Sequence, residues 1–182
     1  KGRELQALKV GVIGYGIMGG TFARLLDAMG VDVLAYDKYK SGYAEGGVVE
    51  CSLERLYEEA DVISLHLPLT AETKGYADSA FFNACKNPIH IINTARGPIL
   101  DTAALVSALD SGKVLSASLD VLEYEKSSFT SLFEGPLPPA LASLLERENV
   151  LLSPHIAGWS KESFEKMGAG LAQKVLTAIK TD

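Results

Sequence analysis

The chain has little of three features that mark other classes of protein. It has only two cysteines, Cys51 and Cys85, in 182 residues, so it has no dense disulfide framework of the kind found in small secreted domains. Its apolar runs are the length of strands, and none approaches the roughly 20 residues needed to cross a bilayer. The opening residues, KGRELQALKV, contain neither the apolar core nor the cleavage site of a signal peptide. These absences predict a cytoplasmic protein without a membrane partner.

Basic charge is also scarce. The chain has 17 Lys and Arg against 23 Asp and Glu, a net charge of −6, and the basic residues are interspersed with acids. Nucleic-acid-binding proteins gather Lys and Arg on one face, so nucleic acid is not expected as a partner. Apolar residues make up 47% of the chain, which is enough for one well-packed domain but not comfortably for two. A single domain over residues 1–182 is the prediction.

Strand-sized apolar runs alternate with helical patterns along the whole chain. Gly, Ser, Asp and Pro residues punctuate them, as expected at helix ends and turns. Unbroken apolar strands that alternate with helices are typical of a doubly wound α/β domain, whose parallel sheet is covered on both faces and binds ligands at the carboxyl ends of its strands. The predicted strands are 9–14, 31–37, a short one at 48–49, 61–67, 89–95, 115–121 and 150–154. The predicted helices are one that contains residues 22–29 and ends at Gly30, and others over about 52–60, 78–86, 101–112, 138–147 and 160–179.

A glycine motif, GYGIMG at residues 14 to 19, lies between the first predicted strand and the first predicted helix. Gly14 permits a tight turn, Gly16 lets the backbone approach a pyrophosphate, and Gly19 lets the helix lie against the strand. Such a motif alone is also compatible with a simple packing turn. Here Asp37 ends the next strand, near the spacing of about 20 residues expected for a ribose-binding acid. This combination predicts dinucleotide binding.

The carboxylate at Asp37 also bears on which dinucleotide is bound. It would accept hydrogen bonds from ribose hydroxyls and repel a 2′-phosphate, so NAD is preferred to NADP. Lys38 beside it weakens this preference without reversing it.

Three chemically versatile residues follow the ends of three later strands. Arg96 in INTARGP could grip a carboxylate with two hydrogen bonds, and Glu125 in DVLEYE and His155 in SPHIAGW could act as a pair. Taken singly, each has a structural alternative: a surface ion pair, a solvated loop acid and a core histidine. A carboxylate beside a histidine stabilises its protonated form, which makes it a general acid suited to carbonyl reduction by hydride. Nothing in the pattern indicates a metal site.

Together these motifs resemble the D-isomer-specific 2-hydroxyacid dehydrogenases. GYGIMG, Asp37, LHLPLTAET, INTARGPILD, SLDVLEYE and NVLLSPHIAGWS occur in the order and approximate spacing of that family, over about residues 3–176. The resemblance implies a Rossmann-type nucleotide-binding domain and NAD-dependent oxidation of a D-2-hydroxy acid, or reduction of a 2-keto acid. The resemblance also implies that Arg96 binds the substrate carboxylate and carbonyl, that Glu125 supports the histidine, and that His155 acts as acid in reduction and as base in oxidation.

The resemblance also implies cofactor contacts that the residues alone do not reveal. Besides the three glycines and Asp37, these are pyrophosphate contacts at Ile17 and Met18, adenosine contacts at Leu67 and Thr73, nicotinamide-ribose contacts at Thr94 and Ala95, a carboxamide contact at Asp120, and closure of the same region by Gly158.

The sequence departs from the family pattern around Glu125. Lys126 stands where the family usually has Pro, and the interval from Glu125 to His155, filled by residues 127–147, is several residues longer than is common, which puts the substrate's identity in doubt. In the family the nucleotide domain is inserted into a substrate domain, and residues 1–182 of this chain correspond to the inserted nucleotide domain alone. We therefore expect the substrate domain to be absent from this chain, and the chain to bind NAD yet turn over 2-keto acids poorly.

Other functions remain open. An NAD(H)-sensing module resembling the dehydrogenase-like corepressors needs only the cofactor contacts, whereas the presence of Arg96, Glu125 and His155 favours an enzyme. The NAD domain of an adenosylhomocysteinase fits GYG but not INTARG or SPHIAGW. By analogy with the family, a homodimer through the nucleotide domain is expected.

Overall fold

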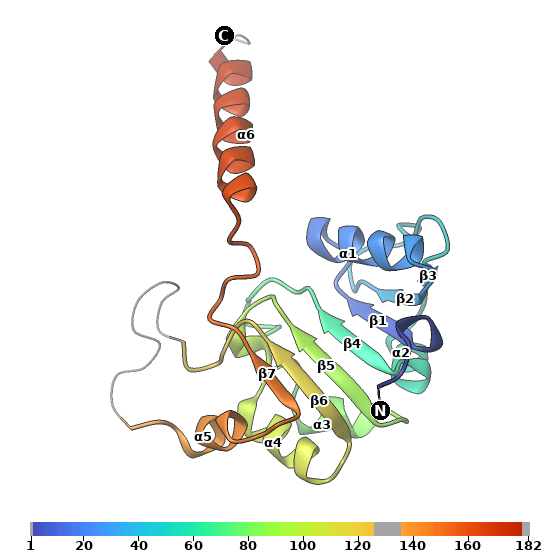
Figure 1. Cartoon of the computed structure of the whole chain (residues 1–182). Coiled ribbons are helices and arrows are strands. Elements are labelled where there is room, and N and C mark those ends of the chain that lie inside the picture. Colours follow the sequence, from blue (N-terminus) through green and yellow to red (C-terminus); the bar gives the residue numbers. More distant parts are fainter. Residues whose placement is uncertain (1, 126–135, 180–182) are drawn as a thin grey trace.

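A parallel sheet forms the centre of the molecule. The computed structural model describes residues 2–125 and 136–179, and within them the strands are ordered β3-β2-β1-β4-β5-β6-β7 (Figure 1). Every neighbouring pair is parallel, which confirms the predicted doubly wound α/β fold. The strands are β1 (Lys9–Ile13), β2 (Asp32–Tyr36), β3 (Val49–Glu50), β4 (Val62–Leu65), β5 (Ile89–Asn93), β6 (Val114–Leu119) and β7 (Val150–Leu152).

The helices begin where the sequence provides caps. The side chains of Ser52, Asp78 and Asp101 each accept a hydrogen bond from a backbone N–H in the first turn of the helix that follows. The predicted cap at Asp101 is thereby confirmed. The α-helices are α1 (Ile17–Ala28), α2 (Leu53–Glu59), α3 (Ser79–Ala84), α4 (Thr102–Asp110), α5 (Pro139–Leu145) and α6 (Lys161–Ile179), with 3₁₀ turns η1 (Leu5–Ala7) and η2 (Gly97–Ile99).

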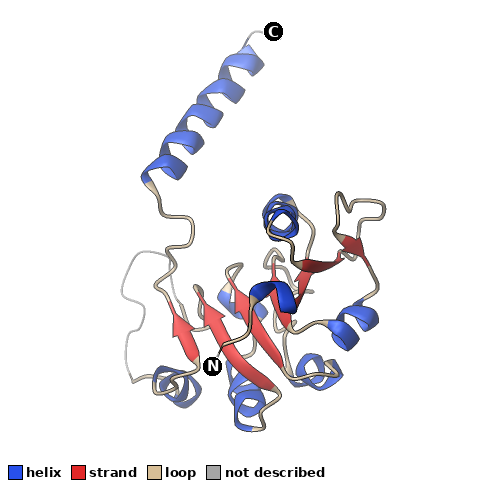
Figure 2. Cartoon of the chain, turned by 45° about the vertical axis from the view of Figure 1, so that its right-hand side comes forward, coloured by secondary structure: helices blue, strands red, loops and turns tan. Residues whose placement is uncertain are grey.

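The apolar core is divided by the sheet into two clusters. Alternate residues of β1 face opposite sides. Val12 belongs to the cluster that includes Ala23 and Leu26 of α1, whereas Ile13 belongs to the cluster that includes residues of α2 to α5. Helices therefore lie on both faces of the sheet (Figure 2). The chain winds from β1 outward to β3 and then returns to β4 on the other side. The reversal between β1 and β4 is where a doubly wound sheet opens a crevice for its ligand.

Coverage of the sheet is uneven. Helices lie on both faces, as the sequence pattern predicted, but α6 contributes nothing to either face, because it has no buried residue and projects away from the sheet (Figures 1 and 2). In β5 and β6, buried residues alternate with half-buried ones such as His90, Ser116 and Ser118, so these strands are not unbroken apolar runs. Ser160 does accept a hydrogen bond from Ser163 N, as its predicted role as a cap requires.

The structure also bears on two further expectations. No helix in the described ranges is long and apolar enough to span a membrane. Of the lengthened interval before His155, residues 126–135 lie outside the described residues, and the later part forms α5, where Leu141 and Leu144 are buried.

Candidate functional site

The glycine turn joins β1 to α1 as predicted. Gly14 has a φ of 95°, and a Cβ atom there would lie 2.5 Å from the His66 carbonyl oxygen. A Cβ atom at Gly19 would overlap the Gly14 carbonyl, so this glycine allows the helix to approach the strand. Gly16, in contrast, has open space where its Cβ would be. It is the N-cap residue of α1, whose first backbone N–H groups have no partner within the helix. The turn therefore presents backbone donors to a ligand.

Asp37 lies immediately after β2 with its carboxylate held in place. Oδ2 accepts a hydrogen bond from Tyr15 N at 2.8 Å, and Oδ1 accepts one from Tyr39 N at 3.0 Å. The carboxylate thus bridges the glycine turn and the loop after β2. It is half-buried, so part of it still faces the cleft described next.

A cleft of about 520 Å³ runs beside the glycine turn at the carboxyl ends of β1, β2 and β4. Of the predicted cofactor residues, Gly14, Gly16, Asp37, Leu67 and Thr73 line it. Ile17 and Met18 do not line it, but they are highly exposed in the first turn of α1 beside it. The structure therefore brings together most of the residues predicted for the adenosine and pyrophosphate end of a dinucleotide.

Thr73, which lines this cleft, holds the backbone of the loop after β4 through its hydroxyl group. Its Oγ1 donates a hydrogen bond to Pro68 O at 2.5 Å and accepts one from Thr70 N at 2.8 Å. The hydroxyl therefore fixes the shape of the loop after β4.

Arg96 lies beyond the end of β5, where a buried asparagine shapes the turn. Asn93, which is 1% exposed, accepts a hydrogen bond from Ala95 N and donates one to Arg96 O, both at 3.1 Å. The Arg96 guanidinium is exposed and donates to Ala95 O at 2.6 Å, and it pairs with none of the carboxylates among the described residues. Thr94 is also exposed on this rim.

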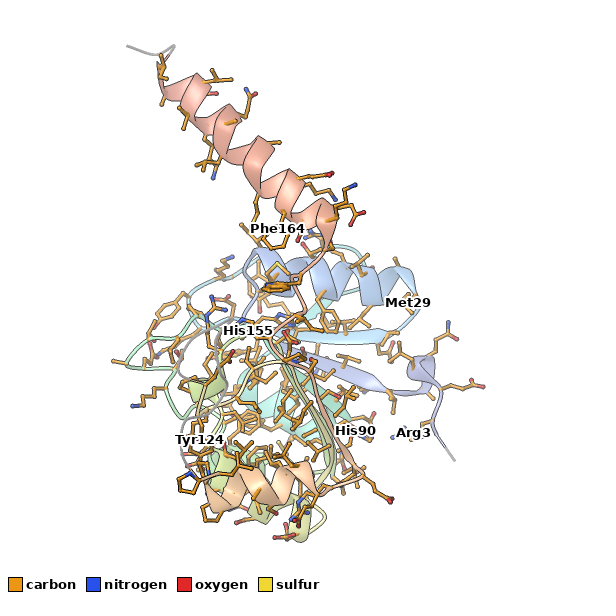
Figure 3. The ribbon with its side chains drawn as sticks, turned by 60° about the vertical axis from the view of Figure 1, so that its left-hand side comes forward. Arg3, Met29, His90, Tyr124, His155 and Phe164 are labelled. Carbon is orange, nitrogen blue, oxygen red and sulfur yellow. The ribbon has the colours of Figure 1, made fainter. Side chains whose placement is uncertain are left out.

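Glu125 and His155 form the pair predicted from the sequence. His155 Nδ1 lies 2.8 Å from Glu125 Oε1, with side chains 24% and 9% exposed, respectively. Leu122, Leu145 and Leu152 lie with them around a hollow of about 170 Å³. In such apolar surroundings a carboxylate and an imidazole interact more strongly than in water. Figure 3 shows His155 at the end of the molecule from which α6 departs, with His90 well away from it.

Asp120 has a structural role that the sequence did not reveal. Its buried carboxylate accepts hydrogen bonds from Ser153 Oγ at 2.6 Å and from the backbone N–H groups of Ile156 and Ala157 at 2.9 Å. His155 N in turn donates to Asp120 O at 2.8 Å. His155 has a φ of 57°, a left-handed conformation that costs free energy in a residue other than glycine. Asp120 and Ser153 therefore hold His155 in this conformation.

Gly97 was also missed, although its position after Arg96 was a signal. A Cβ atom at Gly97 would lie 2.7 Å from Glu123 N and would overlap the Leu122 carbonyl. The same carbonyl accepts a hydrogen bond from Glu125 N. The absence of a side chain at Gly97 thus lets the Arg96 turn lie against the segment that carries Glu125.

Gly158, another of the predicted cofactor residues, is exposed in the loop between β7 and α6, and the position of its Cβ atom would be open space. Among the described residues, no group of three or more His, Cys, Asp or Glu side chains could hold a metal ion.

Comparison with known proteins agrees with this geometry. The sequence model of the D-isomer specific 2-hydroxyacid dehydrogenase NAD binding domain matches residues 1–157. A D-lactate dehydrogenase of Lactobacillus delbrueckii subsp. bulgaricus is 38% identical over 169 residues, which are 91% of this chain and 51% of that protein. A glyoxylate reductase of Thermofilum pendens is 35% identical over 182 residues, covering 98% of this chain and 50% of that protein.

Solved structures agree as well. The NAD complex of a D-isomer specific 2-hydroxyacid dehydrogenase from Lactobacillus delbrueckii ssp. bulgaricus superposes with a TM-score of 0.87 at 32% identity, covering 98% of this chain and 55% of that one. The D-lactate dehydrogenase of Aquifex aeolicus, complexed with NAD and lactic acid, gives 0.82 at 37% identity, covering 99% and 56%. The chain spans about half the length of the relatives it matches.

Proposed function

Because this chain belongs to the D-isomer-specific 2-hydroxyacid dehydrogenase family, whose NAD-binding domain it matches, we propose that it is the cofactor-binding part of an enzyme that interconverts D-2-hydroxy acids and 2-keto acids. The observation that carries the proposal is the hydrogen bond between Glu125 and His155. Both residues follow the carboxyl ends of strands, at the same edge of the sheet as the nucleotide cleft, which lies at the reversal between β1 and β4. A domain that only sensed NAD(H) would need the cleft but not this pair.

The cofactor end of the site supports NAD. The open space at Gly16 and the first turn of α1 suit the pyrophosphate, and the anchored Asp37 carboxylate suits the ribose hydroxyls. When bound, NADH supplies the hydride for carbonyl reduction. Thr94, Ala95 and Gly158, which lie beyond β5 and β7, are proposed to surround the nicotinamide end, together with Asp120.

Arg96 is proposed to bind the carboxylate of the substrate. An exposed guanidinium can donate two parallel hydrogen bonds to a carboxylate, and no described acid competes for it. Its contact with Ala95 O directs the side chain back over its own turn, so binding a substrate requires this 2.6 Å hydrogen bond to be rearranged or shared.

His155 is proposed to exchange the proton with the substrate oxygen. Glu125 engages Nδ1, which orients the ring, and Nε2 on the other side of the ring is the atom proposed to exchange the proton. In reduction the imidazolium gives a proton to the developing alkoxide, and in oxidation the neutral ring removes the hydroxyl proton. The carboxylate stabilises the charged ring in either direction.

A homodimer is the proposed assembly. Its support is the apolar side of α6, where Phe164, Met167, Leu171, Val175 and Ile179 are all about half exposed or more. Exposed apolar stripes of this kind commonly mark interfaces. A cytoplasmic location stays a prediction.

The test is a steady-state assay that follows NADH consumption with glyoxylate, pyruvate and hydroxypyruvate. It is done on this 182-residue chain and on the full-length protein. We expect His155→Ala to lower kcat by about 100- to 10,000-fold, the range of a general acid, and to change the NADH dissociation constant less than about twofold. Glu125→Gln should also lower kcat, because Glu125 orients the His155 ring.

His90→Gln is the matched control. His90 lies in β5, where its Nδ1 bonds to Ser116 Oγ at 2.7 Å, away from the catalytic rim, so turnover should be unchanged. Near-normal turnover of His155→Ala would remove this residue from the mechanism. NADH binding without turnover of any 2-keto acid by the full-length protein would favour the sensing function instead.

A further inference from the structure

The mouth of the nucleotide cleft carries two lysines close to Asp37. Lys38 and Lys40 both line the cleft. A 2′-phosphate on the adenosine ribose would be attracted by ammonium groups at this point, so the two lysines oppose the discrimination that Asp37 provides.

Both ammonium groups are engaged by the protein itself. Lys40 Nζ donates to Tyr15 O, in the glycine turn, at 2.7 Å. Lys38 Nζ pairs with Oε1 of Glu72, and Glu72 Oε2 accepts a hydrogen bond from the Tyr39 hydroxyl. Glu72 comes from the loop after β4, on the opposite wall of the cleft from Lys38. It therefore reaches across the mouth to the loop that follows Asp37.

The charges at the mouth are balanced as a result. Lys38 lowers the pKa of the Glu72 carboxyl, and Glu72 raises the pKa of Lys38, so both stay charged at neutral pH. Two carboxylates, Asp37 and Glu72, then stand beside the engaged ammonium groups of Lys38 and Lys40.

We propose that Glu72 is a specificity-determining residue that favours NAD over NADP by neutralising Lys38. With Glu72 present, a 2′-phosphate near Asp37 meets two carboxylates and finds Lys38 already paired. Without it, the Lys38 ammonium group turns to the phosphate. The inference rests on the proposed function, because it requires the adenosine ribose to lie at Asp37.

A purely mechanical role for Glu72 predicts something different. If the contacts of Glu72 with Lys38 and Tyr39 served only to close the cleft, their loss would weaken NADH and NADPH equally. The electrostatic role changes the ratio of the two affinities, because only NADPH carries the additional phosphate. The ratio therefore separates the two roles.

The experiment measures dissociation constants for NADH and NADPH by fluorescence at low ionic strength, on the wild-type chain and on Glu72→Gln. We expect NADPH to bind about five- to tenfold more tightly to the variant, as for one unit charge acting on a phosphate through a water-like dielectric. The NADH constant should stay within about twofold. The gain should shrink as salt is added, since these groups are exposed.

Two further variants make the result specific. Glu58→Gln removes the same charge from another exposed glutamate, whose lysine partner Lys86 is outside the cleft, and should leave both constants unchanged. Lys38→Gln in the Glu72→Gln background should cancel the gain.

An unchanged NADPH-to-NADH ratio in Glu72→Gln, or equal weakening of both nucleotides, overturns the proposal while leaving NAD binding intact. Failure of the wild-type chain to bind NADH removes the proposed function itself and this inference with it.

Discussion

Gly97→Ala tests whether the Arg96 turn and the Glu125 segment are held together by close backbone packing. Cβ atoms essentially never lie within 3.0 Å of other heavy atoms, yet one at Gly97 would lie 2.7 Å from Glu123 N and nearer still to the Leu122 carbonyl. These neighbours are backbone atoms, so no side chain can rotate to relieve the overlap. The two segments must separate.

The expected cost is at least that of overpacking a core, about 1 to 3 kcal/mol in the free energy of unfolding. For a chain of this length it corresponds to a fall of several degrees in Tm. Because Leu122 O also accepts the hydrogen bond from Glu125 N, the separation should disturb the Glu125–His155 pair.

Thermal unfolding followed by circular dichroism measures the first effect, and the NMR signal of the His155 Nδ1 proton reports the second. Gly158→Ala is the matched control, because nothing lies within 4 Å of its Cβ position and its φ is not positive. If Gly97→Ala melted within about 1 °C of the wild type with the His155 signal unmoved, the close approach would not hold the site together.

Two further predictions concern titration and thiol chemistry. Burial lowers the pKa of His66 in the folded state. Near and below the ordinary histidine pKa of about 6.5, the unfolded state therefore binds more protons than the folded state, and the free energy of unfolding should fall as the pH drops from 7.5 toward 5.5. Urea titrations of His66→Gln should show a shallower pH dependence; an identical slope would contradict this. Burial also raises the pKa of Cys85 to about 11, so a thiol reagent at pH 8 should label half-buried Cys51 first. Rapid labelling of folded Cys51→Ser would contradict the burial of Cys85.

Local sequence signals predicted the parts of the site that depend on short stretches of chain. Glycines that must turn sharply or allow a helix to approach can be recognised from their spacing, which is why Gly14, Gly16 and Gly19 were placed correctly. Asp37 follows from the length of one strand-helix-strand unit. Glu125 and His155 were paired because parallel strands end at the same edge of a sheet.

Long-range contacts account for what was missed. Asp120 was assigned only to the cofactor, although its carboxylate binds Ser153 and the backbone after His155, more than 30 positions away. The pairing of Glu72 with Lys38 joins two loops that the sequence separates by a similar interval. No periodicity or motif records such contacts, because they depend on how two connections are placed after the sheet has formed.

The sequence by itself determined the parallel sheet, the nucleotide turn and the pairing of Glu125 with His155, because hydrophobic period, glycine spacing and strand ends are local properties of the chain. Only the tertiary structure decided that α6 projects from the sheet, that Asp120 fixes a left-handed His155, and that Glu72 neutralises Lys38 across the cleft. Each of these depends on free energies of contact between segments distant in sequence, which the order of residues does not display.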